Sequence, residues 1–216
     1  MSNLINFYTK IKQKKTHNPN LEKHGITLPF RGLINCASGG GKTNLVLNIL
    51  FEMHNTFHDI IIVSKAEEPL YDHLLKKLKN IQIFYITKNE SIPNVKRLEE
   101  GQNGLIIFDD MVLTKDNKIG ELFLRGRKLH YSCVYISQSF FGTPKIVRQN
   151  INYVWLGKGM TRRDIRLVLS EFSISLSVDE LEQIYNNLTK ENMNFMLIDL
   201  NKKQIKKNIN NIILEY

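Results

Sequence analysis

The sequence predicts an α/β fold in which helices cover both faces of a doubly wound, mainly parallel sheet. Short apolar runs rich in β-branched residues alternate along the chain with amphipathic runs whose apolar positions recur at helical spacing. A glycine-rich turn at 36–43 joins the first apolar run to the first amphipathic one. Strands that alternate with helices in this way pair in parallel within one sheet, because each helix carries the chain back across a face.

Each expected element has its own local pattern. Apolar runs predict strands at 31–37, 59–65, 81–87, 104–110, 132–139, 152–158, 194–200 and 205–214. Amphipathic runs predict helices at 42–54, 69–80, 93–100, 118–130, 144–150, 162–172 and 179–188. Residues 1–27 are polar and basic, so we expect an extension, helical at 7–15, on a single domain that spans 28–216.

The composition favours a basic protein in a reducing compartment. Thirty Lys and Arg against 21 Asp and Glu give a formal net charge of +9, which favours polyanionic partners and nucleic acid above all. The cysteines, Cys36 and Cys133, lie inside apolar runs without disulfide or metal-ligand spacing, so a reducing intracellular environment is expected. No apolar run reaches the roughly 18 residues that a membrane span requires.

The turn at 36–43, CASGGGKT, nearly matches the phosphate-binding pattern G-x-x-x-x-G-K-[ST], with Cys36 in place of the first glycine. Between a strand and a helix, its backbone N–H groups and the helix N-terminus can bind phosphate. Lys42 is expected to reach the β- and γ-phosphates of ATP, and the Thr43 hydroxyl to bind Mg²⁺. Cys36 suits this loop if its φ is negative, because only a positive φ requires glycine. The expected ATP-binding residues are Ser38, Gly39, Gly40, Gly41, Lys42 and Thr43.

A second chemical feature is the strand GLIIFDD (104–110), which ends in two acids. Asp109 is expected to hold Mg²⁺ through water, and Asp110 to orient or deprotonate the attacking water. Gln138, at the tip of the next expected strand, is expected to contact the γ-phosphate or that water. The alternative at each of these positions is a polar residue that ends a strand in solvent and has no chemical role. The order of loop, acids and Gln favours an additional-strand, catalytic-acid NTPase.

At these motifs the chain resembles a known family. CASGGGKT, LIIFDD and YISQ, in this order, are similar to the FtsK/HerA superfamily of DNA-pumping ATPases, and most of all to the poxvirus-type genome-packaging ATPases of large DNA viruses and virophages. The stretch FLRGRKLHYSCVYISQSFFGTPKIVRQN matches that family's pattern, except that Lys128 stands where His is common. The resemblance covers about 28–156.

The resemblance implies a RecA-type P-loop NTPase that forms a homo-oligomeric ring and uses ATP and Mg²⁺. It implies sequence-independent translocation of double-stranded DNA into a capsid, with capsid or portal protein as a further partner. The implied location is the host cytoplasm, a virus factory or the virion.

A ring site needs a positive charge from the neighbouring subunit, because the γ-phosphoryl transition state spreads charge over several oxygens. Arg127 is expected to supply it by its motif position, with Arg148 next and Arg125 as a further candidate. Basic residues also gather at 145–166 and 202–207, where they suit contacts to DNA phosphates or a solvated face.

Two other functions stay open. The chain length suits a P-loop nucleoside or nucleotide kinase, although the sequence carries no clear signature of an arginine-bearing lid or an acceptor pocket. The other is a nucleotide-binding structural protein without turnover, which Cys36 supports.

Overall fold

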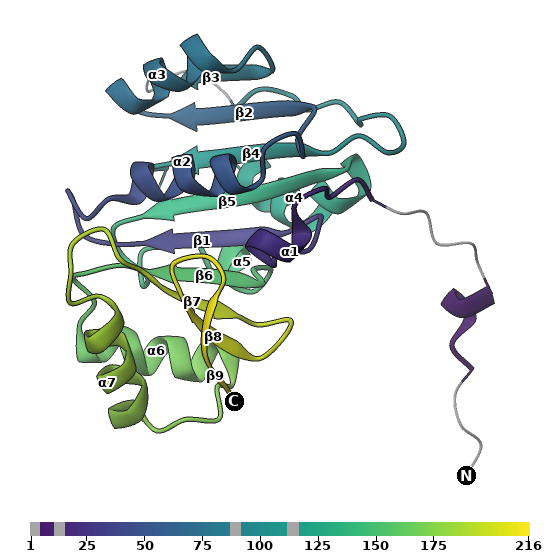
Figure 1. The fold of residues 1–216 in the computed structure, drawn as a ribbon. Coiled ribbons are helices and arrows are strands. Elements are labelled where there is room, and N and C mark those ends of the chain that lie inside the picture. The colour runs from purple at the N-terminus through teal and green to yellow at the C-terminus, as the bar shows by residue number, and fades with distance from the viewer. Residues whose placement is uncertain (1–4, 11–15, 87–91, 112–116) are drawn as a thin grey trace.

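The computed structural model describes residues 5–10, 16–86, 92–111 and 117–216. Within these residues, nine strands form one sheet (Figure 1). In spatial order they are β3 (Ile81–Tyr85), β2 (Asp59–Ser64), β4 (Gly104–Asp109), β5 (Tyr131–Ser137), β1 (Arg31–Asn35), β6 (Tyr153–Leu156), β7 (Met196–Asp199), β8 (Gln204–Lys207) and β9 (Asn211–Glu215). Neighbours from β3 to β6 pair in parallel, and neighbours from β6 to β9 pair antiparallel. The predicted mainly parallel α/β sheet is confirmed.

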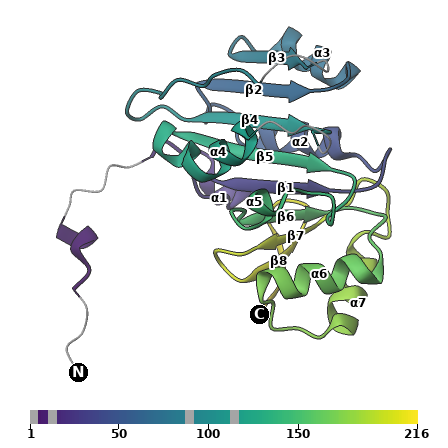
Figure 2. The ribbon, with the colours of Figure 1, turned by 180° about the vertical axis from the view of Figure 1, so that it is seen from behind.

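Helices cover both faces of this sheet, as a doubly wound fold requires. They are α1 (Leu21–His24), α2 (Lys42–Glu52), α3 (Pro69–Lys77), α4 (Lys118–Arg125), α5 (Lys145–Arg148), α6 (Arg162–Phe172) and α7 (Val178–Leu188), with 3₁₀ turns η1 (Phe7–Lys10) and η2 (Gly126–Leu129). Figure 1 shows α1 and α2 on one face, and the reverse view in Figure 2 shows α4 and α5 on the other. Among the described residues, no helix combines the length and apolar character needed to cross a membrane.

The core is divided by the sheet into two apolar clusters. Successive side chains of a strand point to opposite faces, so in β1 Leu33 joins the cluster beneath α4 and α6, whereas Ile34 joins the cluster beneath α2 and α3. Both residues are fully buried. Continuous apolar strands such as β4 and β5 are therefore explained by burial on two faces.

Some expected elements differ from the structure. Residues 93–100, expected to be helical, contain no helix. The Leu98 N–H instead donates to the Leu129 carbonyl (3.2 Å), in keeping with the marginal stability of helices shorter than about 12 residues. The expected helix 118–130 ends at Arg125 and tightens into η2, where Gly126 lies against β5 so closely that an added Cβ would be 3.1 Å from Cys133 Sγ.

The chain termini also depart from the expected pattern. The single strand expected at 205–214 is a hairpin of β8 and β9, with a turn over 208–210. The helix expected at 7–15 is the short turn η1, and residues 11–15 lie outside the described residues, as does Thr87 at the end of the strand expected at 81–87.

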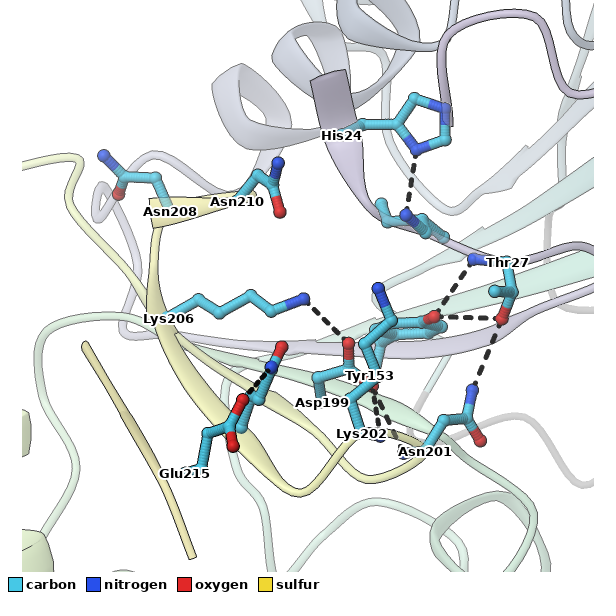
Figure 3. A network of polar contacts seen from close by, with 12 residues as sticks. His24, Thr27, Tyr153, Asp199, Asn201, Lys202, Lys206, Asn208, Asn210 and Glu215 are labelled. Atoms are coloured by element: carbon cyan, nitrogen blue, oxygen red, sulfur yellow. Dashed lines mark hydrogen bonds and ion pairs between the residues drawn. The ribbon is translucent and has the colours of Figure 1, made fainter. Parts of the chain in front are cut away.

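The segment before β1 is held against the C-terminal strands by a polar network (Figure 3). The Tyr153 hydroxyl accepts a hydrogen bond from the Thr27 N–H (3.0 Å), and the Asn210 amide donates to the Lys23 carbonyl (2.9 Å). At its centre, Lys206 Nζ lies 2.8 Å from Asp199 Oδ2, and the two side chains are 1% and 0% exposed. Lys206 therefore forms an ion pair in the interior, and the expectation that it faces solvent or DNA is wrong.

Candidate nucleotide-binding site

The loop at 36–41 leaves the end of β1 and enters α2 with Gly41 as its N-cap. Gly39 and Gly41 have φ values of 72° and 90°, which only glycine adopts without strain. Lys42 begins the helix, and its Nζ donates to the carbonyls of Cys36 (3.1 Å) and Ala37 (2.9 Å). The ammonium group is therefore held over the loop, next to the helix N-terminus where an anion is favoured.

Cys36 fits this loop without backbone strain, since it is not among the described residues with positive φ. Its side chain is 1% exposed, and its thiol, with a single hydrogen to donate, lies within hydrogen-bond distance of the carbonyls of Gly40 (3.4 Å) and Lys158 (3.3 Å). An added Cβ at Gly40 would lie 2.1 Å from Cys36 Sγ, so the sulfur fills the space beneath Gly40. Burial raises the pKa of this thiol, which keeps it protonated and able to donate. Cys36 therefore packs the interior of the loop.

The carboxyl ends of the central strands bring the predicted acid to the same edge of the sheet. Asp109 is level with Ile136 of β5, and Asn35 of β1 is level with Ser137. Burial raises the pKa of the Asp109 carboxyl; a hydrogen bond from Tyr71 and the charge of Lys42 oppose this rise. Because β4, β5 and β1 are parallel and in this register, Asp109 and the loop that carries Lys42 lie at the same edge of the sheet.

Tyr71 of α3 completes this group. Its hydroxyl donates to Asp109 Oδ2 (2.7 Å), and the Thr43 side chain lies close enough to oppose the rise that burial causes in the pKa of the same hydroxyl. Thr43 and Asp109, the two expected metal ligands, thus lie near one hydroxyl. An alcohol and a carboxylate are hard oxygen donors of the kind that Mg²⁺ prefers, so the residues present fit the expected ion.

Asp110 and Gln138 are exposed at this edge, each directly after its strand. Asp110 has a φ of 54°, a left-handed conformation that aspartate adopts more readily than most residues. The chain after Gln138 lies against Asn35: the N–H groups of Ser139 and Phe140 point at its amide, whose oxygen accepts from both (3.1 Å and 2.9 Å) when the amide is turned to suit these donors. The buried amide of Asn35 therefore ties the loop that carries Gln138 to the strand that carries the phosphate loop.

The two predicted arginines lie elsewhere. Arg127, in η2, precedes β5, so it lies at the amino-terminal edge of the sheet, about a strand length or roughly 20 Å from the loop. It is exposed, and its charge interacts with that of Arg31. Arg148 Nη1 is paired with Glu171 Oε2 (3.1 Å), its guanidinium lies over the Phe140 ring, and its side chain is 13% exposed. Neither arginine lies beside the loop in this chain.

Comparison with known proteins agrees with this geometry. The family model described as Poxvirus A32 protein matches residues 21–199. The chain belongs to the A32 family. It is 23% identical over 147 residues to the DNA packaging protein OPG160 of variola virus and 24% identical over 142 residues to that of vaccinia virus, strain Copenhagen. These alignments cover 62% and 59% of this chain and 54% and 53% of the relatives, so the chain spans about half the length of the curated relatives it matches.

Solved structures show the same fold. The genome packaging NTPase B204 from Sulfolobus turreted icosahedral virus 2, in complex with ATP-gammaS, matches with a TM-score of 0.58 and 14% identity over 87% of this chain and 100% of that one. The cytoplasmic domain of the Thermomonospora curvata type VII secretion ATPase EccC matches with a TM-score of 0.60 and 14% identity, over 86% of this chain and 25% of that one. At such low identity these likenesses establish the fold, and the P-loop NTPase fold expected from the sequence is confirmed.

Sequence reasoning missed two residues of this A32-family site. Tyr71 lies in an ordinary amphipathic helix, and nothing local distinguishes it from a core tyrosine. Asn35 carried a usable signal, because a buried amide at the end of an otherwise apolar strand needs a hydrogen-bond partner.

Proposed function

We propose that this chain is the ATP-hydrolysing subunit of a motor that drives double-stranded DNA into a viral capsid. One observation carries the proposal: the loop with Lys42 and Thr43 and the strand end with Asp109 lie at the same edge of the sheet. The relatives' description as DNA packaging proteins supports the biological role. Host cytoplasm or a virus factory is the corresponding location, and the virion is a further one.

In this proposal the loop amides and Lys42 bind the phosphates of ATP, at a helix N-terminus that favours negative charge. Thr43 and Asp109 would hold Mg²⁺, whose charge neutralises phosphate oxygens during phosphoryl transfer. Asp110 orients the attacking water and accepts its proton, and Gln138 contacts that water or the γ-phosphate. Asn35 positions Gln138 through the backbone of the next residues.

The proposal includes a homo-oligomeric ring in which Arg127 acts on the neighbour's ATP. Its exposed position at the sheet edge opposite its own loop supports a role between subunits. Arg148 is held by Glu171 and Phe140 inside its own subunit, so we assign it to supporting the loop after β5. The net charge of +9 supports sequence-independent contact with DNA phosphates, and capsid or portal protein is a further proposed partner.

The test is ATP turnover per subunit measured against protein concentration, with and without double-stranded DNA. The wild type should show turnover that rises with assembly and with DNA, and Lys42→Ala should abolish it. Arg127→Ala should lose the rise while assembling as the wild type does, and Lys128→Ala, an exposed basic neighbour, should keep it. Phosphoryl transfer to a nucleoside would identify a kinase instead. Absence of turnover in an assembled ring with DNA would favour a structural nucleotide-binding protein.

A further inference from the structure

Tyr71 occupies a place that the proposed chemistry does not by itself require. Its hydroxyl donates to Asp109 of β4 and lies near Thr43, the second residue of α2, the helix that follows the loop after β1. A tyrosine hydroxyl has one hydrogen to donate and lone pairs to accept. Donation to Asp109 uses that hydrogen, and the lone pairs remain available to a donor such as the Thr43 hydroxyl. The bond to Asp109 therefore fixes this carboxylate beside Thr43.

The position of this hydroxyl is set by a buried ring. Tyr71 is 0% exposed and belongs to the apolar cluster that contains Ile62 and Ile107 of the adjacent strands. It lies in the first turn of α3, which begins with Pro69 after the N-cap Glu68, whose side chain accepts from the Leu70 N–H (3.4 Å). A ring packed on the sheet at the start of a capped helix has little freedom to move, so the hydroxyl is a rigid support.

We propose that Tyr71 is a positioning residue that holds Asp109 beside Thr43 in the arrangement that binds the Mg²⁺ of the nucleotide. This inference rests on the proposed function. The hydrogen bond engages Oδ2 of Asp109 and leaves the Oδ1 lone pairs for a metal-bound water. Groups that orient metal ligands from behind typically contribute 10- to 100-fold to metal affinity or activity. Tyr71 should therefore set Mg²⁺ affinity without touching the nucleotide.

The test is the Tyr71→Phe variant, which keeps the buried ring and removes only the hydroxyl. Binding of a fluorescent ATP analogue is measured in excess EDTA and then across a Mg²⁺ titration. The affinity for the nucleotide without metal should match that of the wild type. The Mg²⁺ midpoint, which is the Mg²⁺ concentration that gives half of the change in nucleotide affinity, should rise by about 10-fold or more. In an Asp109→Asn background the same change should shift the Mg²⁺ midpoint no further, because the partner carboxylate is gone.

The chain offers a matched control at the opposite edge of the sheet. The Tyr131 hydroxyl also donates to a carboxylate, that of Asp59, from a buried ring. Tyr131→Phe removes an equivalent hydrogen bond far from the loop, so its Mg²⁺ midpoint should equal that of the wild type. Thermal unfolding of both variants measures the stability that each hydroxyl contributes.

Two outcomes would overturn the inference while leaving the proposed function intact. One is a Tyr71→Phe variant whose Mg²⁺ midpoint equals that of the wild type. The other is an equal loss of affinity with and without metal, which would mean a general structural role. A wild-type protein that binds no nucleotide, or binds it without any effect of Mg²⁺, would instead refute the proposed function itself.

Discussion

Restoring the consensus glycine at the start of the phosphate loop should destabilise this protein. The Cys36→Gly substitution removes a buried Cβ and Sγ from beneath Gly40, together with the hydrogen bond that the thiol donates to the carbonyl of Gly40 or Lys158. Burial is worth about 0.8 kcal/mol per methylene-sized group, or about 1.6 kcal/mol for the two atoms. The greater backbone entropy of glycine in the unfolded chain adds about 0.5–1 kcal/mol.

The free energy of unfolding should therefore fall by about 2 kcal/mol. For a chain of this size that corresponds to a melting temperature about 4–8 °C lower. Cys36→Ala keeps the Cβ and avoids the entropy term, so it should lose about half as much. Nucleotide affinity should not change, because Cys36 faces the interior and not the phosphate side of the loop. A Cys36→Gly variant that melts at or above the wild-type temperature would refute this account of the loop.

Three further predictions concern packing and charge. Gly40→Ala should impair folding and nucleotide binding through its clash with Cys36 Sγ, and adding Cys36→Gly should restore part of the binding in a fluorescence titration. Lys206→Met should lower the free energy of unfolding by about 3–5 kcal/mol in a denaturant titration, because it leaves Asp199 buried without its partner; the exposed Lys203→Met is the control and should have little effect. Burial lowers the pKa of His24 from 6.5 to about 4, so the unfolded chain binds its proton first as the pH falls. The contribution of neutral His24 to the free energy of unfolding is therefore complete above about pH 6.5 and is lost as the pH falls toward 4. Relative to His24→Asn, the wild-type free energy of unfolding should fall by about 3 kcal/mol over that range. Equal pH profiles of the two proteins' unfolding free energies would contradict the last prediction.

The elements that local pattern could identify are those with strong periodicity and clear ends. The helix expected at 162–172 coincides with α6, which begins after the capping box of Thr161 and Asp164. The expectation for 93–100 was wrong because an eight-residue amphipathic run forms a helix only if packing stabilises it. Here the Leu98 N–H instead donates to the Leu129 carbonyl of η2. The break between β8 and β9 was missed because the turn at 208–210 consists of Asn and Ile without Gly or Pro.

Local sequence is enough to specify the glycine-rich loop at 36–43 and the order of the groups expected to follow it. Strand, glycine-rich turn and helix are adjacent in the chain, so Lys42 and Thr43 are positioned by local geometry alone. The strand-end positions of Asp109 and Gln138 follow in the same way from apolar runs that end in polar residues.

Which residues meet across the sheet depends on the order of its strands. Strand order brought Tyr71 to Asp109, and it paired Lys206 with Asp199 in the interior although Lys206 lies in a basic stretch of sequence. It also placed Arg127 at the edge opposite its own loop. Such contacts join segments far apart in the chain, and the free energy that selects them comes from packing the whole sheet, which no short pattern contains.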